Sequence, residues 1–249
     1  MSGWPVEYAR RVLSRVDSTN AEAARIAPEL IQPTWILALE QTAGRGRRGR
    51  VWENPKGNFA ATLLLRPNEA PHLMALRSFV AALALHEAFV TVSGRPEAFA
   101  LKWPNDVLLN GGKVAGILLE SVGVFHGVSY LAVGIGVNLI GAPDPAVLEE
   151  RAVRPVSLLS ETGAHVTPEE FLDVLAGAYA AFETQFTTYG FEPIRQAWLA
   201  RAAKLGEVIT ARTGNTERVG TFETLDEHGN LVLRTARGRE AIPAADVFF

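Results

Sequence analysis

A short run of glycines and arginines, residues 44–50, is the segment most suited to chemistry. Three glycines let a ligand approach the backbone closely, and arginines stand at positions 45, 47, 48 and 50, with no acid before Glu53. The letters satisfy the dinucleotide pattern G-x-G-x-x-G, but a Rossmann fingerprint must open a helix and this run continues into Val-Trp-Glu-Asn-Pro. The segment is suited to a small polyanion, and a solvated basic surface is the alternative.

A second group of charges surrounds a predicted hairpin. Lys102 opens a Lys-Trp-Pro-Asn-Asp turn, and Lys113 follows eleven positions later at the start of a strand. A lysine placed there beside glycines can neutralise a phosphate or a carboxylate. Asp106 is equally well explained as a turn former. Trp52 and Trp103 could stack on a flat ring, although single tryptophans more often pack in a core.

The elements around these residues place them on loops between strands. Apolar runs of strand length occupy residues 11–16, 35–40 and 58–66, so the arginine-glycine segment joins two strands. Ser18-Thr19-Asn20 stands directly before an alanine-rich helical run, residues 21–26, which is typical of a helix N-cap.

The middle of the chain alternates between long helices and a group of strands. Helices are predicted over residues 73–92, 169–186 and 193–203, with a short helical turn at 156–159. Four strands with glycine-rich turns are predicted over residues 98–103, 107–109, 113–122 and 128–139. This pattern predicts an α+β fold, a mixed β-sheet with helices on one face.

Beyond residue 205 the sequence changes to short alternating strands. They are predicted at residues 207–212, 218–225, 231–235 and 240–242, separated by turn signals. We therefore expect a catalytic domain of residues 1–204 and a small C-terminal β-barrel domain of residues 205–249. A unit of about 45 residues is near the lower limit for independent folding, so it is expected to lean on the larger domain.

Composition excludes several classes of protein. The chain has 249 residues, a formal net charge of -3 and a pI near 6.0, which disfavour broad binding of nucleic acid or anionic membranes. It contains no cysteine, and its N-terminal residues carry no apolar signal region. The most apolar stretch, residues 79–92, is shorter than the roughly 20 residues of a membrane span. We expect a cytoplasmic protein.

Together these motifs resemble the catalytic domain of biotin protein ligases, in the family's order and approximate spacing over about residues 11–140. The matching segments are Ser18-Thr19-Asn20, Gln41-Thr42-Ala43-Gly44-Arg45-Gly46-Arg47-Arg48-Gly49-Arg50, Trp52, Lys102-Trp103-Pro104-Asn105-Asp106, Lys113 and Gly134-Ile135-Gly136-Val137-Asn138. The tail resembles the family's small C-terminal β-barrel. Two segments differ, since Glu53-Asn54-Pro55 replaces a Ser-Pro pair and Phe59-Ala60-Ala61-Thr62 replaces a leucine-rich strand start.

The resemblance implies a two-step reaction with biotin and ATP as substrates. They give biotinyl-5′-AMP and pyrophosphate, and the biotinyl group then passes to a lysine on the biotin carboxyl carrier domain of a biotin-dependent carboxylase. A carboxylate that attacks a phosphate requires several cations nearby, and a reactive acyl-adenylate requires a loop that excludes water. Mg²⁺ is expected to bind mainly through ATP, and no metal ligand is assigned to the protein.

The resemblance also assigns roles to residues. Lys113, Arg47 and Asp106 are the catalytic candidates: Lys113 contacts the biotin carboxylate and the α-phosphate, and Asp106 orients or deprotonates the incoming amine. The implied biotin site consists of Ser18, Thr19, Asn20, Gln41, Gly44, Arg45, Gly46, Arg47, Lys113 and Gly116. The implied nucleotide site consists of Arg47, Arg50, Trp52, Lys102, Asn105, Lys113 and Asn138, with adenine packed on Trp52.

Three other functions share parts of this pattern. A lipoate–protein ligase or lipoyl transferase resembles this fold and uses similar chemistry, but the full Gly-Arg-Gly-Arg-Arg-Gly loop favours biotin. A nucleic-acid-binding module is disfavoured by the acidic net charge. A non-catalytic biotin- or nucleotide-binding protein is disfavoured by Lys113.

The expected partners and dynamics complete the prediction. About ten residues precede the first predicted strand, too few for a DNA-binding helix-turn-helix domain, so no DNA partner is expected. No membrane partner is expected either, and the protein is predicted to be a monomer or a homodimer. The loop of residues 44–50 is predicted to be mobile without ligand, because its glycines and solvated arginines offer few buried contacts.

Overall fold

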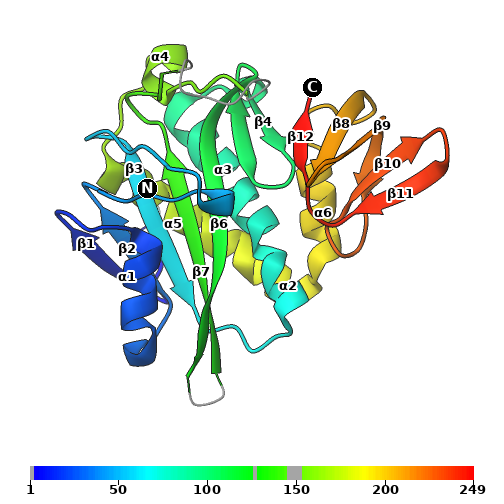
Figure 1. Ribbon diagram of the computed structural model, residues 1–249. Helices are drawn as coiled ribbons and strands as arrows, with labels where there is room; N and C mark the ends of the chain where they lie inside the picture. Colours follow the sequence, from blue (N-terminus) through cyan, green and yellow to red (C-terminus); the bar gives the residue numbers. More distant parts are fainter. Residues whose placement is uncertain (1–2, 126–127, 145–152) are drawn as a thin grey trace.

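The computed structural model describes residues 3–125, 128–144 and 153–249, which form two β-sheets and the helices packed around them (Figure 1). The larger sheet has the strand order β1-β2-β3-β7-β6-β5-β4. Its strands are β1 Ala9–Leu13, β2 Thr34–Ala38, β3 Phe59–Leu65, β4 Phe99–Lys102, β5 Asp106–Leu109, β6 Gly112–Phe125 and β7 Val128–Val137. The predicted mixed sheet and α+β class are confirmed.

The first strand lies earlier in the chain than predicted. β1 pairs in parallel with β2, from Ala9 opposite Thr34 to Leu13 opposite Ala38, while the other ladders of this sheet are antiparallel. Beyond β1, Val16 makes only an isolated parallel bridge to Gln41. Because parallel strands end at the same edge of a sheet, this pairing brings the segments that follow β1 and β2 next to each other.

Helices cover both faces of the larger sheet. α3 Arg77–Ser93 and α5 Pro168–Tyr189 lie on one face, with α6 Phe191–Leu199 packed against them (Figure 1). α1 Thr19–Ile26 lies on the opposite face, in a smaller core with Leu64 of β3. Since alternate residues of a strand point to opposite faces, Leu63 joins the main core beneath α3 and α5. α1 was predicted as a helix at residues 21–26, but the prediction that the helices cover one face did not place it on the other.

The helices between the two sheets are close to those predicted. The predicted helix over residues 73–92 is present as α2 Pro71–Ala75 and α3, separated at Leu76. In the described chain, Pro71–Ser93 is the one helical stretch long and apolar enough to cross a membrane, but 72% of its most apolar window is buried within the protein. Its apolar character therefore agrees with a core helix.

Two shorter helices show clear reasons for their ends. α4 Leu158–Thr162 begins with a capping box in which Ser157 and Ser160 satisfy each other's backbone groups. α6 ends at Leu199, before the predicted end at 203, because Ala202 instead pairs with Leu101 of β4.

The smaller sheet contains five antiparallel strands in the order β11-β10-β9-β8-β12. They are β8 Val208–Thr213, β9 Thr216–Leu225, β10 Leu231–Thr235, β11 Gly238–Ile242 and β12 Asp246–Phe248. The two outermost strands, β11 and β12, are not joined to each other, so the hydrogen-bonded ladder is not closed into a barrel. β12 was not predicted, because three residues are too few to show an alternating pattern.

The smaller sheet leans on the larger domain, as its size implied. The indole nitrogen of Trp103 donates a hydrogen bond to the carbonyl of Gly229 at 3.0 Å, and Trp103 is buried. Gly229 has a φ of +75° and packs so closely that an added Cβ would lie 2.6 Å from the Phe79 ring. Glycine is needed at this junction for both reasons. The boundary near Lys204 stays a prediction.

Candidate active site

A cavity of about 630 Å³ lies over the β3, β7 and β6 strands and is closed at one side by the arginine-glycine loop. Almost all predicted site residues line it. They are Ser18, Thr19, Asn20, Gln41, Arg45, Gly46, Arg47, Arg50, Trp52, Lys102, Asn105, Asp106, Lys113, Gly116 and Asn138. The structure thus collects in one place residues that are spread over nearly half of the chain, from Ser18 to Asn138.

Gly44 is the one predicted site residue that does not line this cavity; it borders an adjacent cleft behind the loop. An added Cβ at Gly44 would overlap the Gln41 side chain and the Trp52 carbonyl. Other groups do approach the backbone of Gly44 closely, as predicted, but they are Gln41 and Trp52 of the same protein and not a ligand.

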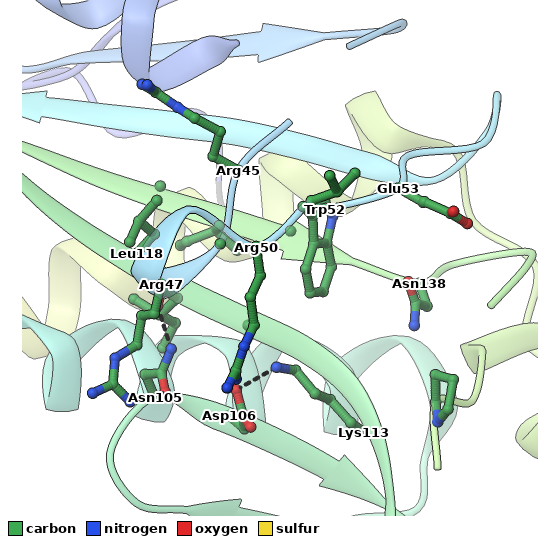
Figure 2. A pocket seen from close by; sticks show the side chains of 18 of the residues that line it. Arg45, Arg47, Arg50, Trp52, Glu53, Asn105, Asp106, Lys113, Leu118 and Asn138 are labelled. Atoms are coloured by element: carbon green, nitrogen blue, oxygen red, sulfur yellow. Dashed lines mark hydrogen bonds and ion pairs between the residues drawn. The ribbon is translucent and has the colours of Figure 1, made fainter. Parts of the chain in front are cut away.

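The loop itself is a tight hairpin. The amide of Trp52 donates to the carbonyl of Gly44 at 2.9 Å, and the amide of Gly46 donates to that of Arg50 at 2.8 Å. Figure 2 shows Arg47 and Arg50 pointing toward Asn105 and Asp106, while Arg45 points the other way. The hairpin thus directs its cations to two sides of the cavity.

Cations gather where the loop meets the β4–β5 turn. Lys113 Nζ lies 2.7 Å from Asp106 Oδ1, and an Arg47 nitrogen donates to Asn105 Oδ1 at 3.3 Å (Figure 2). Burial lowers the pKa of the Lys102 ammonium, and the nearby Lys113 and Arg47 lower it further. Burial also lowers the pKa of Arg47. These cations lie close together and are partly removed from water, and both conditions cost free energy. A bound anion would offset that cost, so the cluster favours the binding of an anion.

A flat apolar surface lies beside the cations. Trp52 packs on two glycines of the sheet, Gly116 and Gly136, and Lys113 Nζ lies 5.6 Å from its ring centre. Asn138 is buried, donates its amide to the carbonyl of Val156 at 3.1 Å, and leaves its buried Oδ1 without a hydrogen-bond partner in the described chain. An aromatic face with an unused acceptor beside it suits a purine with an amino group.

The opposite wall of the cavity is polar and buried. Ser18 is the N-cap of α1, as predicted, because its hydroxyl accepts from the amide of Ala21. The amide of Thr19 donates to Gln41 Oε1 at 2.9 Å, a contact that the pairing of β1 with β2 makes possible. Helix capping and cavity lining are therefore combined in one segment.

Comparison with known proteins settles the family. Residues 12–138 match the biotin/lipoate A/B protein ligase family, and residues 204–249 match the biotin protein ligase C terminal domain. The chain belongs to the biotin/lipoate protein ligase family. The resemblance predicted from the motifs is confirmed.

Individual members of the ligase family agree over nearly the whole chain. The biotin–[acetyl-CoA-carboxylase] ligase of Paracoccus denitrificans is 60% identical over 238 residues, 96% of this chain and 99% of that relative. The bifunctional ligase/repressor BirA of Bacillus subtilis is 32% identical over 95% of this chain and 71% of that relative. The biotin protein ligase from Aquifex aeolicus in complex with biotin and ATP superposes with a TM-score of 0.79 at 28% identity, covering 96% of this chain and 98% of that one.

The ligase domain receives one wall of its cavity from the C-terminal sheet, which the sequence analysis did not foresee. Asp246 Oδ2 lies 2.5 Å from Arg48, 3.4 Å from Arg50 and 3.7 Å from Arg212. Val247 and Phe248 also line the cavity. A carboxylate of the last strand thus contacts a loop that lies almost two hundred residues earlier in the chain. Such a contact cannot be predicted from a local sequence pattern.

Substitution of Gly136 by alanine is expected to disturb the side of the cavity where the sequence predicts nucleotide binding. An added Cβ would lie 2.7 Å from Trp52 Cζ2 and closer to two other atoms of the indole. We expect the free energy of unfolding to fall by about 1–3 kcal/mol, typical of overpacking. ATP affinity should also fall while biotin affinity is kept. Denaturant titration and calorimetry measure these effects.

Gly141→Ala is the matched control, because among the described residues beyond its two chain neighbours none has an atom within 4 Å of an added Cβ at that position. Equal ATP affinity in the Gly136→Ala variant and the wild type would contradict the packing of the nucleotide on Trp52.

Proposed function

We propose that the protein is an ATP-dependent biotin protein ligase that forms biotinyl-5′-AMP and transfers the biotinyl group to a lysine of a biotin carboxyl carrier domain. One observation carries the proposal: a single cavity joins a buried polar wall, a cluster of partly desolvated cations and an aromatic surface with an unused acceptor. The relatives named as biotin ligases, and the solved relative that holds biotin and ATP, support it.

The first step joins two anions, so cations dominate the chemistry. A carboxylate oxygen of biotin attacks the α-phosphorus, the bond from that phosphorus to the β-phosphate bridging oxygen breaks, and pyrophosphate leaves with the bonding pair. Lys113 and Arg47 neutralise the charge that builds up on the α-phosphate. Trp52 carries the adenine, and Asn138 Oδ1 accepts from the purine amino group.

The second step transfers the acyl group to an amine. The lysine nitrogen attacks the acyl carbon, the bond to the phosphate oxygen of AMP breaks, and the nitrogen loses a proton. Asp106 lies at the cavity wall and is held by Lys113 at 2.7 Å. It orients the incoming lysine amine, and its carboxylate accepts the proton that the nitrogen loses. Hydrolysis of the adenylate competes with transfer, which makes exclusion of water by the loop important.

Mg²⁺ enters this reaction as part of the MgATP substrate. Within residues 3–125, 128–144 and 153–249 no group of three His, Asp or Glu side chains is placed to hold a metal ion. Asp106 and Asp246, two carboxylates at the cavity, are each paired with cations of the protein. Coordination by the phosphates therefore fits the residues better than a cage of protein oxygens. The cytoplasmic location and the monomeric or homodimeric state stay predictions.

Pyrophosphate release and carrier labelling test the proposal together. The protein is incubated with MgATP and biotin, lipoate or neither, and a biotin carrier domain is then added and weighed by mass spectrometry. Biotin-dependent release followed by a mass increase on the carrier is expected. Release with lipoate alone would move the protein to the lipoate ligases, and no release with either, from folded protein, would contradict ligase activity.

A further inference from the structure

Two residues outside the predicted site complete a hydrogen-bonded chain behind the polar wall. Thr62 on β3 is fully buried, and its hydroxyl lies 2.8 Å from Thr19 Oγ1 and 2.6 Å from Asn20 Oδ1. Asn20 Nδ2 donates to Glu120 Oε2 at 2.7 Å. Thr62 belongs to a segment that departs from the family pattern, yet it contacts this wall directly.

The chemistry of Glu120 sets the direction of every bond in this chain. A carboxylate offers only acceptors, so Asn20 must turn its NH₂ group toward Glu120. The same NH₂ group approaches the carbonyl of Leu118 at 3.5 Å. The amide oxygen of Asn20 therefore faces Thr62, and the single hydroxyl proton of Thr62 goes to that oxygen.

The direction of these bonds determines that the Thr19 hydroxyl is a hydrogen-bond donor toward its protein neighbours. With its proton directed to Asn20, Thr62 can only accept from Thr19. The other neighbour of this hydroxyl, Gln41 Oε1 at 3.2 Å, is also an acceptor, and its identity as oxygen is set by the backbone amide of Thr19. Thr19 thus donates its proton into the wall, and its lone pairs are left to face the cavity.

We propose that Glu120 and Thr62 are positioning residues that orient the Thr19 hydroxyl, drawing its proton to Thr62 at 2.8 Å rather than to Gln41 at 3.2 Å, so that its lone pairs are presented to a ligand ring carrying an N–H donor. The inference rests on the proposed function, in which that ring is the cyclic urea of biotin. A site built to accept from an N–H rejects a ring without one, such as the dithiolane of lipoate, because its own acceptor is then left unpaired.

The chain also extends to the loop. Arg45 Nη2 lies 3.9 Å from the Glu120 oxygen that accepts from Asn20. Glu120 thus stands between the buried wall and the arginine-glycine hairpin.

Thr62→Val and Thr62→Ser form the central test, because valine keeps the branched shape of threonine without the hydroxyl, and serine keeps the hydroxyl without the methyl group. In pyrophosphate release, Thr62→Val is expected to raise the biotin KM about tenfold with little change in kcat or in the ATP KM. Thr62→Ser should stay within about twofold of the wild type. Glu120→Ala is expected to act like Thr62→Val, and its partly exposed side chain makes a folding defect a minor concern. Glu40→Ala, which removes a half-exposed carboxylate paired with Arg15, is the matched control.

A biotin analogue methylated at a ureido nitrogen supplies a readout that a purely structural role would not move. In the wild type the methyl group should raise KM by about tenfold or more, and in Thr62→Val this ratio should fall toward one. Unchanged biotin KM and an unchanged analogue ratio in both Thr62→Val and Glu120→Ala, with an active wild type, would overturn the inference alone. A wild type without biotin-dependent release would overturn the proposed function, and the inference with it.

Discussion

Replacing Lys113 with alanine is expected to slow biotin-dependent pyrophosphate release by about 100- to 1000-fold, the loss typical of removing one group that stabilises a developing anion. Lys113 extends into the cavity between Asp106 at 2.7 Å and the Trp52 ring, 5.6 Å from the ammonium. Its removal also takes away the ion-pair partner of Asp106, and that carboxylate would then repel the phosphates more strongly. Rapid-quench measurement of a single turnover isolates this step.

Lys113→Arg and the double variant Lys113→Ala/Asp106→Asn separate the two effects. Arginine keeps the charge and should retain much more activity, and the double variant should recover part of the loss because the unpaired carboxylate is gone. Biotin binding, measured by calorimetry without ATP, should fall far less than turnover in the alanine variant. Turnover equal to that of the wild type would contradict the role of Lys113 in stabilising the transition state.

The site residues that the sequence identified share a physical property: each belongs to a local motif that has a reason to exist on its own. Ser18 caps a helix, and Lys102 opens the turn that connects β4 with β5. Glycines at 116 and 136 mark places where Trp52 approaches the sheet closely. Such local signals are present in the chain before any tertiary contact forms, so most of the strands and most of the residues that line the cavity could be predicted from them.

The residues that the sequence did not reveal depend on pairing between distant segments. Thr62 looks like one more buried strand residue, and only the alternation of β3 shows that it faces α1 rather than α5. Glu120 becomes important because β6 lies beside β7, which places it opposite Ala132 and within reach of Asn20. The shift of β1 has the same origin, since its register is set by β2. The pairing register between strands that are distant in the sequence cannot be predicted from local patterns.

Asp246→Ala is expected to weaken the loop more than any other single change in the C-terminal sheet. The carboxylate is largely buried, at 14% exposure, and lies within 4 Å of Arg48, Arg50 and Arg212. Arg48 also has a φ of +57°, a conformation that non-glycine residues adopt at a cost and that the ion pair helps to hold. Without Asp246, three cations repel one another and the hairpin loses its anchor on β12.

Two measurements follow from this loss of anchorage. The ATP KM should rise by about tenfold, and biotinyl-adenylate should hydrolyse faster when no carrier is present, because the loop then excludes water less well. Hydrogen exchange of residues 44–50 should become faster than in the wild type, whose loop is held by Asp246 even though the glycines favour mobility. Glu240→Ala is the matched control, because that carboxylate belongs to the same sheet and pairs with Arg218 at 3.0 Å without lining the cavity. If Asp246→Ala and Glu240→Ala behave alike, the C-terminal sheet supports the catalytic domain without guiding its loop.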